Sequence, residues 1–535
     1  MKNKHISSTT LAMETICLTL LFVALLYAFV EPRWETNDDV GMSMVSHGYG
    51  LANEPSPTLI FSNVLWGYVT SSFPVVMEIP GYSALSLSAL MFAGGVIYFG
   101  IVKFGNGRLL ACFICLLVLA RPFVFPQFTL TSGLLAVAGF VSLSLFLVER
   151  HWAYLIVTLI ASGLSFLIRE QEFFLVALIA STLLPLRTVG SDRALIFSAC
   201  AFALFVILAT YVNTVSYSQD SWLFFNELNP LRAAFTDFNV AQAVQAHPDV
   251  LARYGHTQND INLLENWFFA DKRIANPAAI QNILADIGAT KLRHNYLEEG
   301  ISSVKALYSR RLIPVLLSIV ALALIFKSKR LLVAITLLVT LAFVIGALGR
   351  PGTLRIYEPL TALLVVAPFL TPKLQSFPWK SAVSVLAVAA VFASVKVIKT
   401  SIKQQNEIEV QRDILSKLPG KEVVVWGSTF PYEAVYPVLD TVNFRKTVKL
   451  YALGAFTWAP FSVAYSMHSN QNGMIESLVK ETGVWILAAD GSIGLLEIYC
   501  SENFAADLEE VETLTLEKKH LGRFRCLKQE PKATD

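Results

Sequence analysis

Long apolar stretches of about membrane-crossing length recur along this 535-residue chain. A helix needs ~20 apolar residues to cross ~30 Å of hydrocarbon. Only 15% of the residues are charged and 54% are hydrophobic, whereas soluble domains are typically ~25% charged. The sequence therefore predicts a mainly α polytopic membrane protein with about eleven transmembrane helices, at residues 12–30, 82–104, 109–125, 128–148, 152–168, 171–187, 194–215, 311–327, 330–348, 357–371 and 381–397.

The charges of the short connecting loops predict how these spans are oriented. Cytoplasmic loops of membrane proteins carry an excess of lysine and arginine. If the N-terminus is cytoplasmic, every lysine of the short loops lies inside, and the short outer loops contain arginine but no lysine. We therefore expect a multi-pass protein of the bacterial inner (cytoplasmic) membrane with a periplasmic C-terminal part. The chain has no Asn-X-Ser/Thr sequon, which favours a bacterial membrane over a secretory pathway.

Three segments outside the predicted spans fall on the external side in this orientation. They are the loop 31–81, the long segment 216–310 and the tail 399–535. The spacing of apolar residues in the second segment is typical of amphipathic helices. We therefore predict a multi-span membrane domain of residues 1–398, with a large external helical loop at 216–310, followed by the tail.

The tail is predicted to form a small C-terminal external α/β domain. Two short apolar runs, 422–427 and 483–488, are typical of buried strands, and 524–528 is a candidate edge strand. The tail also contains Cys500 and Cys526. In an oxidising periplasm these two cysteines could form a disulfide.

An acidic pair, Asp38 and Asp39, follows the first span. Ionisable groups beside a bilayer are costly to hold, so the pair is a candidate functional site. A carboxylate there can accept a proton from a hydroxyl, or bind Mg²⁺ or Mn²⁺ together with a substrate phosphate. Neighbouring side chains diverge by ~100° on a helix, so we expect one aspartate to react and the other to support it, and both stay candidates. The alternative is that Asn37 or Asp38 only caps a helix from Val40 to His47.

Arginines mark the ends of other helices on the same side. The planar guanidinium binds phosphate through two parallel hydrogen bonds and keeps its charge near lipid. A single arginine at such a position is more often an interfacial residue, but several beside carboxylates suit a phosphate-bearing substrate. Four arginines are therefore candidates for binding the donor phosphate, and three further residues are secondary candidates: Arg121, Arg169, Arg350 and Arg355, and then Glu170, Glu172 and His47.

The middle of the predicted spans contains no Asp, Glu, Lys or Arg. Ion-coupled transporters usually place such groups near the bilayer midplane, so this pattern favours chemistry at the outer surface. A net charge of +2 without a basic run gives no sign of a nucleic-acid partner. Asp260 and Asp271 are further acidic candidates, although solvated helix surfaces explain such residues more often.

The layout and four short strings resemble the glycosyltransferase-C superfamily, in its uncharacterised bacterial branch. The strings are residues 37–42, 55–63, 255–260 and 350–359, and the resemblance in layout covers most of residues 1–370. It implies a catalytic carboxylate in the first external loop, here Asp38 or Asp39. The adjacent pair departs from the Asp-X-Asp or Glu-X-Asp spacing of metal-dependent members, so the use of Mg²⁺ or Mn²⁺ stays open.

The resemblance also implies a function and its partners. A membrane glycosyltransferase of this kind would move a sugar from a polyprenyl-phosphate donor to a cell-surface glycan or lipid acceptor on the outer face. The sugar would be transferred with inversion, with an aspartate as the base. The alternative is a non-enzymatic flippase or export component for lipid-linked glycans. A third class is an assembly or sensor subunit whose external part binds a partner.

Overall fold

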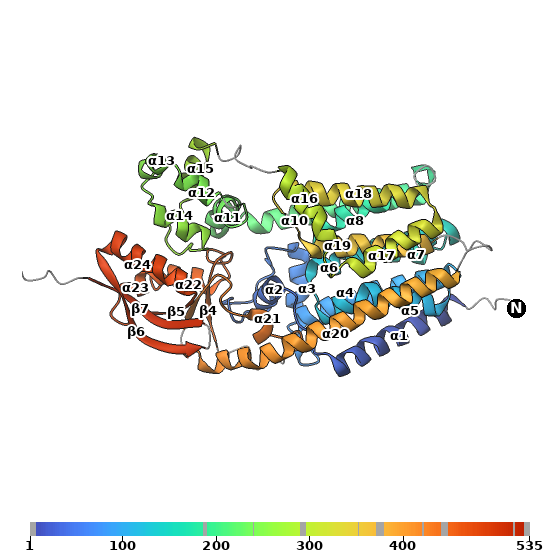
Figure 1. Cartoon of the computed structure of the whole chain (residues 1–535), viewed down its shortest axis with the longest axis horizontal. Helices are drawn as coiled ribbons and strands as arrows, with labels where there is room; N and C mark the ends of the chain where they lie inside the picture. Colours follow the sequence, from blue (N-terminus) through green and yellow to red (C-terminus); the bar gives the residue numbers. More distant parts are fainter. Residues whose placement is uncertain are drawn as a thin grey trace, which may run out of the picture.

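A bundle of helices occupies one end of the molecule and a five-stranded sheet occupies the other, with short helices between and beside them (Figure 1). The computed structural model describes residues 7–185, 190–238, 240–288, 296–350, 352–370, 379–419, 422–439, 448–516 and 519–528.

A helix lies at each of the predicted spans, although residues 186, 187 and 371 fall outside the described ranges. Within those ranges, six helices are long and apolar enough to cross a membrane: α1, α4, α6, α10, α18 and the first part of α20. The remaining helices are shorter, so eleven crossings stay a prediction. The bounds are α1 (Ser8–Phe29), α4 (Gly81–Lys103), α5 (Arg108–Val124), α6 (Phe128–Glu149), α7 (Trp152–Ile168), α8 (Glu170–Leu183), α10 (Arg193–Tyr217), α17 (Ile313–Phe326), α18 (Lys329–Ala347), α19 (Leu354–Val366, followed by η3, Ala367–Phe369) and α20 (Trp379–Lys417).

Helix α6 is the most buried element of the bundle and packs against α4, α7, α8 and α19. Small residues let its neighbours approach closely, as is usual for helices that pack in membranes. A Cβ added at Gly133 would lie 2.3 Å from the Pro359 side chain of α19. Serine hydroxyls add polar contacts, since Ser165 donates to the carbonyl of Ser132 at 2.7 Å. This packing fixes the end of α6 at which the acidic pair lies.

The segment between α10 and α17 is helical, as the sequence predicts. Asp260 is buried there in a capping box with Thr257, and Arg273 lies 3.1 Å from its carboxylate. Asp271 accepts a hydrogen bond from the Tyr499 hydroxyl at 2.9 Å. Structural contacts therefore account for both acids. The helices are η1 (Asp220–Trp222), α11 (Leu223–Thr236), α12 (Ala241–Gln245), α13 (Pro248–Arg253), α14 (Gln258–Glu265), α15 (Pro277–Asp286) and α16 (Tyr296–Leu307).

The C-terminal sheet has the strand order β4-β3-β5-β7-β6, with β4, β3 and β5 parallel and β7 antiparallel to both of its neighbours. The prediction that 524–528 is an edge strand is wrong. These residues belong to β7, which is covered by β6, a strand whose charged residues hid it in the sequence. The elements are β3 (Val423–Trp426), β4 (Leu450–Leu453), β5 (Val484–Ala488), β6 (Ala506–Leu516), β7 (Lys519–Lys528), α21 (Tyr432–Val435), α22 (Val463–Ser469), α23 (Met474–Leu478) and α24 (Asp490–Phe504). Cys500 of α24 and Cys526 of β7 form the predicted disulfide.

Helix α20 joins the bundle to this sheet without a break. The predicted boundary between 398 and 399 falls inside the helix, which continues to Lys417. Residues 379–417 contain neither glycine nor proline, so nothing ends the helix where its composition changes from apolar to polar. Figure 1 shows α20 running along the bundle and on toward the strands.

The loop after the first span ties the bundle to the sheet a second time. It contains α2 (Asn37–His47), α3 (Val64–Ser72) and the short hairpin β1 (Val75–Val76) and β2 (Ile79–Pro80). Just after α2, the carbonyl of Gly50 accepts a hydrogen bond from the Leu450 amide of β4, at 3.0 Å. The Val463 amide donates to Leu51 at the same distance. The loop with the acidic pair is therefore held between the bundle and the sheet.

Candidate active site

Asp38 and Asp39 both lie in the first turn of α2. The helix begins at Asn37, three residues before the expected start at Val40. Its N-cap is Thr36, and no side chain makes a capping hydrogen bond. The interpretation of Asn37 or Asp38 as the capping residue is therefore wrong. The two carboxylates diverge, as neighbours on a helix must, and they have different surroundings.

Asp39 is fully buried. One carboxylate oxygen accepts hydrogen bonds from the Tyr82 hydroxyl at 3.1 Å and from the Phe128 amide at 3.0 Å. That amide is one of the first N–H groups of α6, which have no partner within the helix. Burial, together with the nearby charge of Asp38, raises the pKa of Asp39 well above its usual range. Asp39 therefore fastens α2 to the start of α6.

Asp38 is accessible, with 32% of its side chain exposed. Its carboxylate lies 3.0 Å from a guanidinium nitrogen of Arg355, in the first turn of α19. Because Asp39 is enclosed, Asp38 is the member of the pair that a substrate can reach. The structure thus separates one reachable aspartate from one supporting aspartate.

Two further predicted arginines lie near this pair. Arg169 donates a hydrogen bond to the Phe61 carbonyl at 3.0 Å, and its guanidinium lies 5.4 Å from the centre of the Phe128 ring. Burial lowers the pKa of Arg169, and the charges of Arg355 and Arg350 lower it further. Arg350 lies 3.8 Å from the carboxylate of Asp237 at the end of α11. Of the four predicted arginines, Arg355 therefore pairs with Asp38, and Arg169 lies close enough to be affected by the charges of Asp38, Arg355 and Arg350.

The fourth predicted arginine, Arg121, belongs to a second charged cluster. Its guanidinium contacts both oxygens of Glu35, at 2.7 and 2.8 Å. Arg311 bridges two acids, since it donates to Glu35 at 2.7 Å and also pairs with Glu358. Arg121 approaches Glu358 to 3.7 Å. Each of the two arginines thus contacts both glutamates, so that positive and negative groups alternate around a ring.

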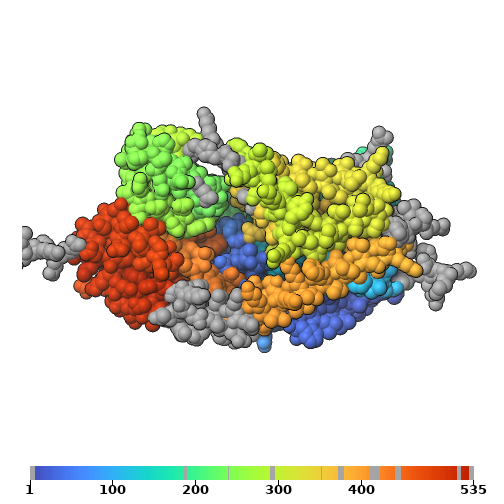
Figure 2. All heavy atoms as spheres, in the orientation of Figure 1, coloured from blue at the N-terminus to red at the C-terminus, as the bar shows by residue number. Residues whose placement is uncertain are grey.

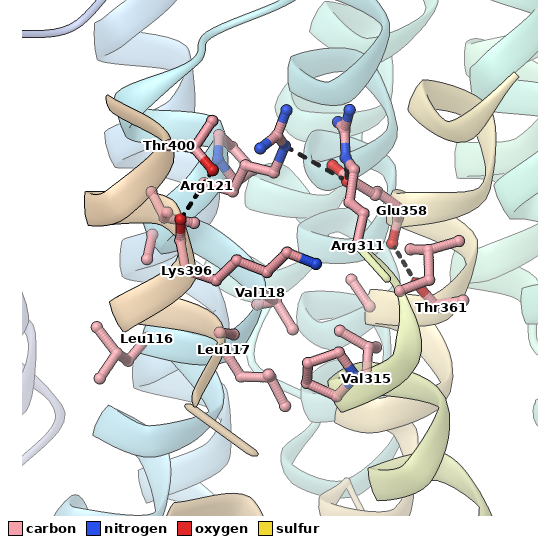
Figure 3. A pocket seen from close by; sticks show the side chains of 17 residues that line it. Leu116, Leu117, Val118, Arg121, Arg311, Val315, Glu358, Thr361, Lys396 and Thr400 are labelled. Carbon is pink, nitrogen blue, oxygen red and sulfur yellow. Dashed lines mark hydrogen bonds and ion pairs between the residues drawn. The ribbon is translucent and has the colours of Figure 1, made fainter. Parts of the chain in front are cut away.

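Three members of this cluster, Arg121, Arg311 and Glu358, form the polar end of a pocket between α5, α17, α19 and α20 (Figure 3). The Lys396 side chain points into the pocket between Arg121 and Arg311, which gives three positive charges against two negative ones. The remaining wall is apolar and includes Leu117 and Val315. The cavity holds about 70 Å³, whereas whole drug-sized ligands occupy ~300–1,000 Å³. The enclosed space thus suits a small anionic group attached to a longer apolar chain.

Two donors in the pocket make no hydrogen bond among the described residues, although one of them, Nε of Arg121, lies 3.7 Å from the Glu358 carboxylate. Nε of Arg121 and Nη2 of Arg311 are buried without a hydrogen-bond acceptor. A buried donor left unpaired costs ~1–3 kcal/mol. An anionic ligand with several oxygens would satisfy both donors.

The two clusters are neighbours in the fold. Glu35 and Asp38 are three residues apart in the chain, and Arg355 and Glu358 are one turn apart on α19. Each cluster therefore pairs a residue of the first loop with a residue of α19. Figure 2 shows the blue residues around α2 at the centre of one face, between the red and brown C-terminal part and the yellow helices, where the surface is hollowed.

The secondary candidates do not join either cluster. His47 accepts a hydrogen bond from the Tyr82 amide at 3.0 Å, which holds the start of α4. Glu170 is exposed and accepts from the Gln171 amide group at 3.1 Å. Glu172 is buried against α6, since a Cβ at Gly133 would lie 3.0 Å from its carboxylate.

Sequence reasoning missed four residues of the second cluster: Glu35, Arg311, Glu358 and Lys396. Arg311 and Lys396 lie within one residue of the ends of predicted spans, where snorkelling is the ordinary explanation. The spacing of Arg355 and Glu358 was an available signal, because residues three apart share a helix face.

The two aspartates contact different partners. Asp39 already accepts hydrogen bonds from Tyr82 and Phe128, and Asp38 faces Arg355. Within the described residues, no group of three or more His, Cys, Asp or Glu side chains is placed to hold a metal ion. The use of Mg²⁺ or Mn²⁺ stays a prediction.

No protein-family model and no curated protein sequence matches this chain. Among solved structures, two crystal structures of ArnT from Cupriavidus metallidurans are similar, one bound to undecaprenyl phosphate and one in the apo state. The sequence identities are 12% and 11%, and each comparison covers 96% of this chain and 98% of ArnT with a TM-score of 0.40. At that TM-score the function has to be argued from the residues of this chain. Two structural neighbours of this chain are thus structures of ArnT, one of which contains bound undecaprenyl phosphate.

Proposed function

We propose that this chain is a membrane glycosyltransferase that moves a sugar from a polyprenyl-phosphate donor to a hydroxyl of a cell-surface glycan or lipid. The proposal rests on one observation above all. A reachable carboxylate, Asp38, pairs with Arg355, one helical turn from Glu358, which lines a pocket that combines excess positive charge with an apolar wall. A lipid phosphate is a ligand with both properties.

The pocket supplies what a donor phosphate needs. The donors of Arg121 and Arg311 that make no hydrogen bond would bind its oxygens, and the Lys396 ammonium would add a third positive charge. The apolar residues of α5 and α17 would contact the first part of the polyprenyl chain. Charge-assisted hydrogen bonds of this kind are about twice as strong as neutral ones.

Asp38 would act as the base. The acceptor oxygen forms a bond to the anomeric carbon, and its proton passes to the Asp38 carboxylate. The bond between the anomeric carbon and the phosphate oxygen breaks, and the electron pair leaves with the phosphate. Positive groups already in place stabilise the charge that develops on this leaving group. A single displacement inverts the anomeric configuration and forms no covalent intermediate with the protein.

The test is mass spectrometry of cell-surface glycans from cells that carry the protein, lack it, or carry Asp38→Asn. We expect one defined sugar substituent to disappear in the last two. Asp286→Asn is the matched control, since Asp286 is 33% exposed and pairs with Arg253 at 2.8 Å, away from both clusters. A change only in the amount of an intact polymer would overturn the proposal and favour the flippase or export alternative. Assays of purified protein in EDTA address the metal, since loss of transfer that added Mg²⁺ or Mn²⁺ restores would support its use.

A further inference from the structure

A row of four arginines extends from Asp38 toward the C-terminal part of the molecule. It consists of Arg169, Arg355, Arg350 and Arg232. The charges of Arg350 and Arg355 lower the pKa of Arg169, and the charge of Arg350 also lowers the pKa of Arg232. The Arg350 pairing with Asp237 brings the row to α11, where Arg232 lies one turn earlier. We call these residues the arginine row.

A row of aromatic side chains accompanies it. The Phe128 and Phe61 rings stack with their centres 6.1 Å apart, and Phe61 meets Phe456 edge-on at 5.9 Å. Two residues before Phe456, a Cβ at Gly454 would lie 3.7 Å from the ring of Trp267. We call Phe128, Phe61, Phe456 and Trp267 the aromatic row.

The two rows are joined at both ends. The guanidinium of Arg169 lies over the Phe128 ring at 5.4 Å, and that of Arg232 lies over the Trp267 ring at 5.0 Å. Cation–π contacts occur within ~6 Å of the ring centre. The two rows therefore run together from the buried Phe128 ring, near Asp38, to the partly exposed Trp267, and we call them together the strip.

This strip has a surplus of positive charge. Arg355 pairs with Asp38 and Arg350 with Asp237. Within the part of the chain that the structure describes, no carboxylate lies within ion-pair distance of Arg169 or Arg232. Burial lowers the pKa of both guanidinium groups, although the charges of Asp38 and Glu172 raise that of Arg169 and the charge of Asp237 raises that of Arg232.

Trp267, at the outer end of the strip, has an unusual backbone conformation. Its φ is +68°, a left-handed conformation that bulky residues rarely adopt and that costs ~1–3 kcal/mol. Residues held in this way concentrate at ligand clamps. The ring is partly exposed, and Gly454 beside it has no side chain to cover it.

We propose that this strip binds the acceptor and that the acceptor is an acidic saccharide, an inference that rests on the proposed function. Carboxylate or phosphate groups of the saccharide would pair with Arg169 and Arg232. The apolar faces of its sugar rings would stack on Phe456 and Trp267. One hydroxyl would then lie beside Asp38. A neutral saccharide would leave the two charges unpaired, so the strip selects against it.

The experiment is isothermal titration calorimetry with the full-length protein in phosphatidylcholine nanodiscs. The probes are tri-galacturonic acid, its methyl ester and a glycerol-phosphate oligomer. We expect the acid to bind at least tenfold more tightly than the uncharged ester. The glycerol-phosphate arm distinguishes carboxylate from phosphate recognition. Equal binding of acid and ester, or no binding of either anion, would overturn the proposal.

Two variants place the binding site on the strip. Arg232→Gln should weaken binding of the acid about tenfold or more. Trp267→Asn should weaken it several-fold by removing the ring, and asparagine is chosen because it tolerates the left-handed backbone. Arg253→Gln, at an exposed arginine of α13, is the control and should bind as the wild type does. Equal binding by all three variants would place the ligand elsewhere.

Two further measurements distinguish a saccharide site from a general polyanion surface, and acceptor binding from catalysis. An octamer of deoxythymidine that binds as tightly as the acid would show a general polyanion surface and would overturn the saccharide assignment. Asp38→Asn should retain binding, because it removes no positive charge. If transfer is absent from all cells while binding follows the predicted order, the proposed function fails and the saccharide site remains.

Discussion

The carboxylate of Asp38 lies 3.0 Å from the guanidinium of Arg355, although 317 residues separate them in the chain. The contact joins the first loop after α1 to the start of α19. The parallel pairing of Glu35 and Glu358 through Arg311 joins the same two segments. One face of α19 thus organises both the reachable aspartate and the pocket beside it.

Asp38→Asn should abolish sugar transfer. An amide cannot accept the proton of the attacking hydroxyl, and loss of a general base typically costs ~10²–10⁴-fold in rate. The rate is measured with purified protein and lipid-phosphate sugar, and protein amount by immunoblot. Asp286→Asn should have wild-type activity. Full activity in Asp38→Asn would remove its catalytic role.

Asp39→Asn should keep most of the activity and stability. The same Asp39 oxygen accepts from both Tyr82 and Phe128, and an asparagine oxygen can do so too. Asp39→Ala leaves these two buried donors unpaired, at ~1–3 kcal/mol each, so its melting temperature should fall clearly below that of Asp39→Asn. If both variants melt alike, Asp39 does not fasten α2 to α6.

Lys396→Met should weaken binding of the lipid-phosphate donor by roughly tenfold, because a charge-assisted contact contributes ~1.5–3 kcal/mol. Arg311→Gln should do the same. In both variants we expect the KM for the donor to rise and the KM for the acceptor to stay unchanged. Lys399→Met is the control, since Lys399 is exposed on α20 and does not line the pocket. A raised KM in Lys399→Met alone would contradict the assigned pocket.

Stability should fall when the pH is lowered from about 6.5 to 4. Burial lowers the pKa of His468 to about 4; its Nε2 lies 2.6 Å from the Tyr451 hydroxyl, and its ring stacks on Trp458 at 4.4 Å. Between these pH values the unfolded chain, with a histidine pKa of ~6.5, binds more protons than the folded one, so acid favours unfolding by up to ~3 kcal/mol.

The measurement is thermal unfolding of the wild type and His468→Gln at several pH values. The difference between the two melting temperatures should change within this window and be constant above pH 7. A constant difference throughout would show that His468 titrates normally.

Reduction of the Cys500–Cys526 disulfide should destabilise the C-terminal sheet. The bond closes a loop with a sequence separation of 26, for which the loss of chain entropy in the unfolded state predicts ~3–4 kcal/mol. Non-reducing peptide mapping should recover the two peptides linked. Hydrogen exchange with and without reductant should then show faster exchange in β7. Recovery of both cysteines as free thiols would contradict the pairing.

The sequence predicts the helices of the bundle better than it predicts the site. Apolar stretches of membrane length have few alternatives to a helix, because lipid offers no partner for backbone groups. Which of Asp38 and Asp39 is reachable depends on Tyr82 and Phe128, which are distant in the chain. No local pattern contains that information, so the sequence identifies the pair but does not show which aspartate is accessible and which is buried.

Charged residues at span ends are the other case that the sequence left open. Lys396 and Arg311 resemble interfacial anchors when each is taken alone, and only the packing of α20 and α17 against α5 and α19 brings them together. The predicted boundary at 398 falls inside α20 for a related reason. A change from apolar to polar composition marks where lipid ends, not where a helix ends.

The continuity of α20 has a mechanical consequence. A 39-residue helix is ~58 Å long at ~1.5 Å per residue and turns ~100° with each residue. The direction of the Lys396 side chain and the rotation of the C-terminal end of the helix at Lys417 are therefore coupled. Inserting one residue between Lys396 and Lys417 would rotate the sheet relative to Lys396 by more than a quarter turn, whereas seven residues would nearly restore the phase. Exchange of the C-terminal part between relatives should thus succeed only in whole turns of this helix.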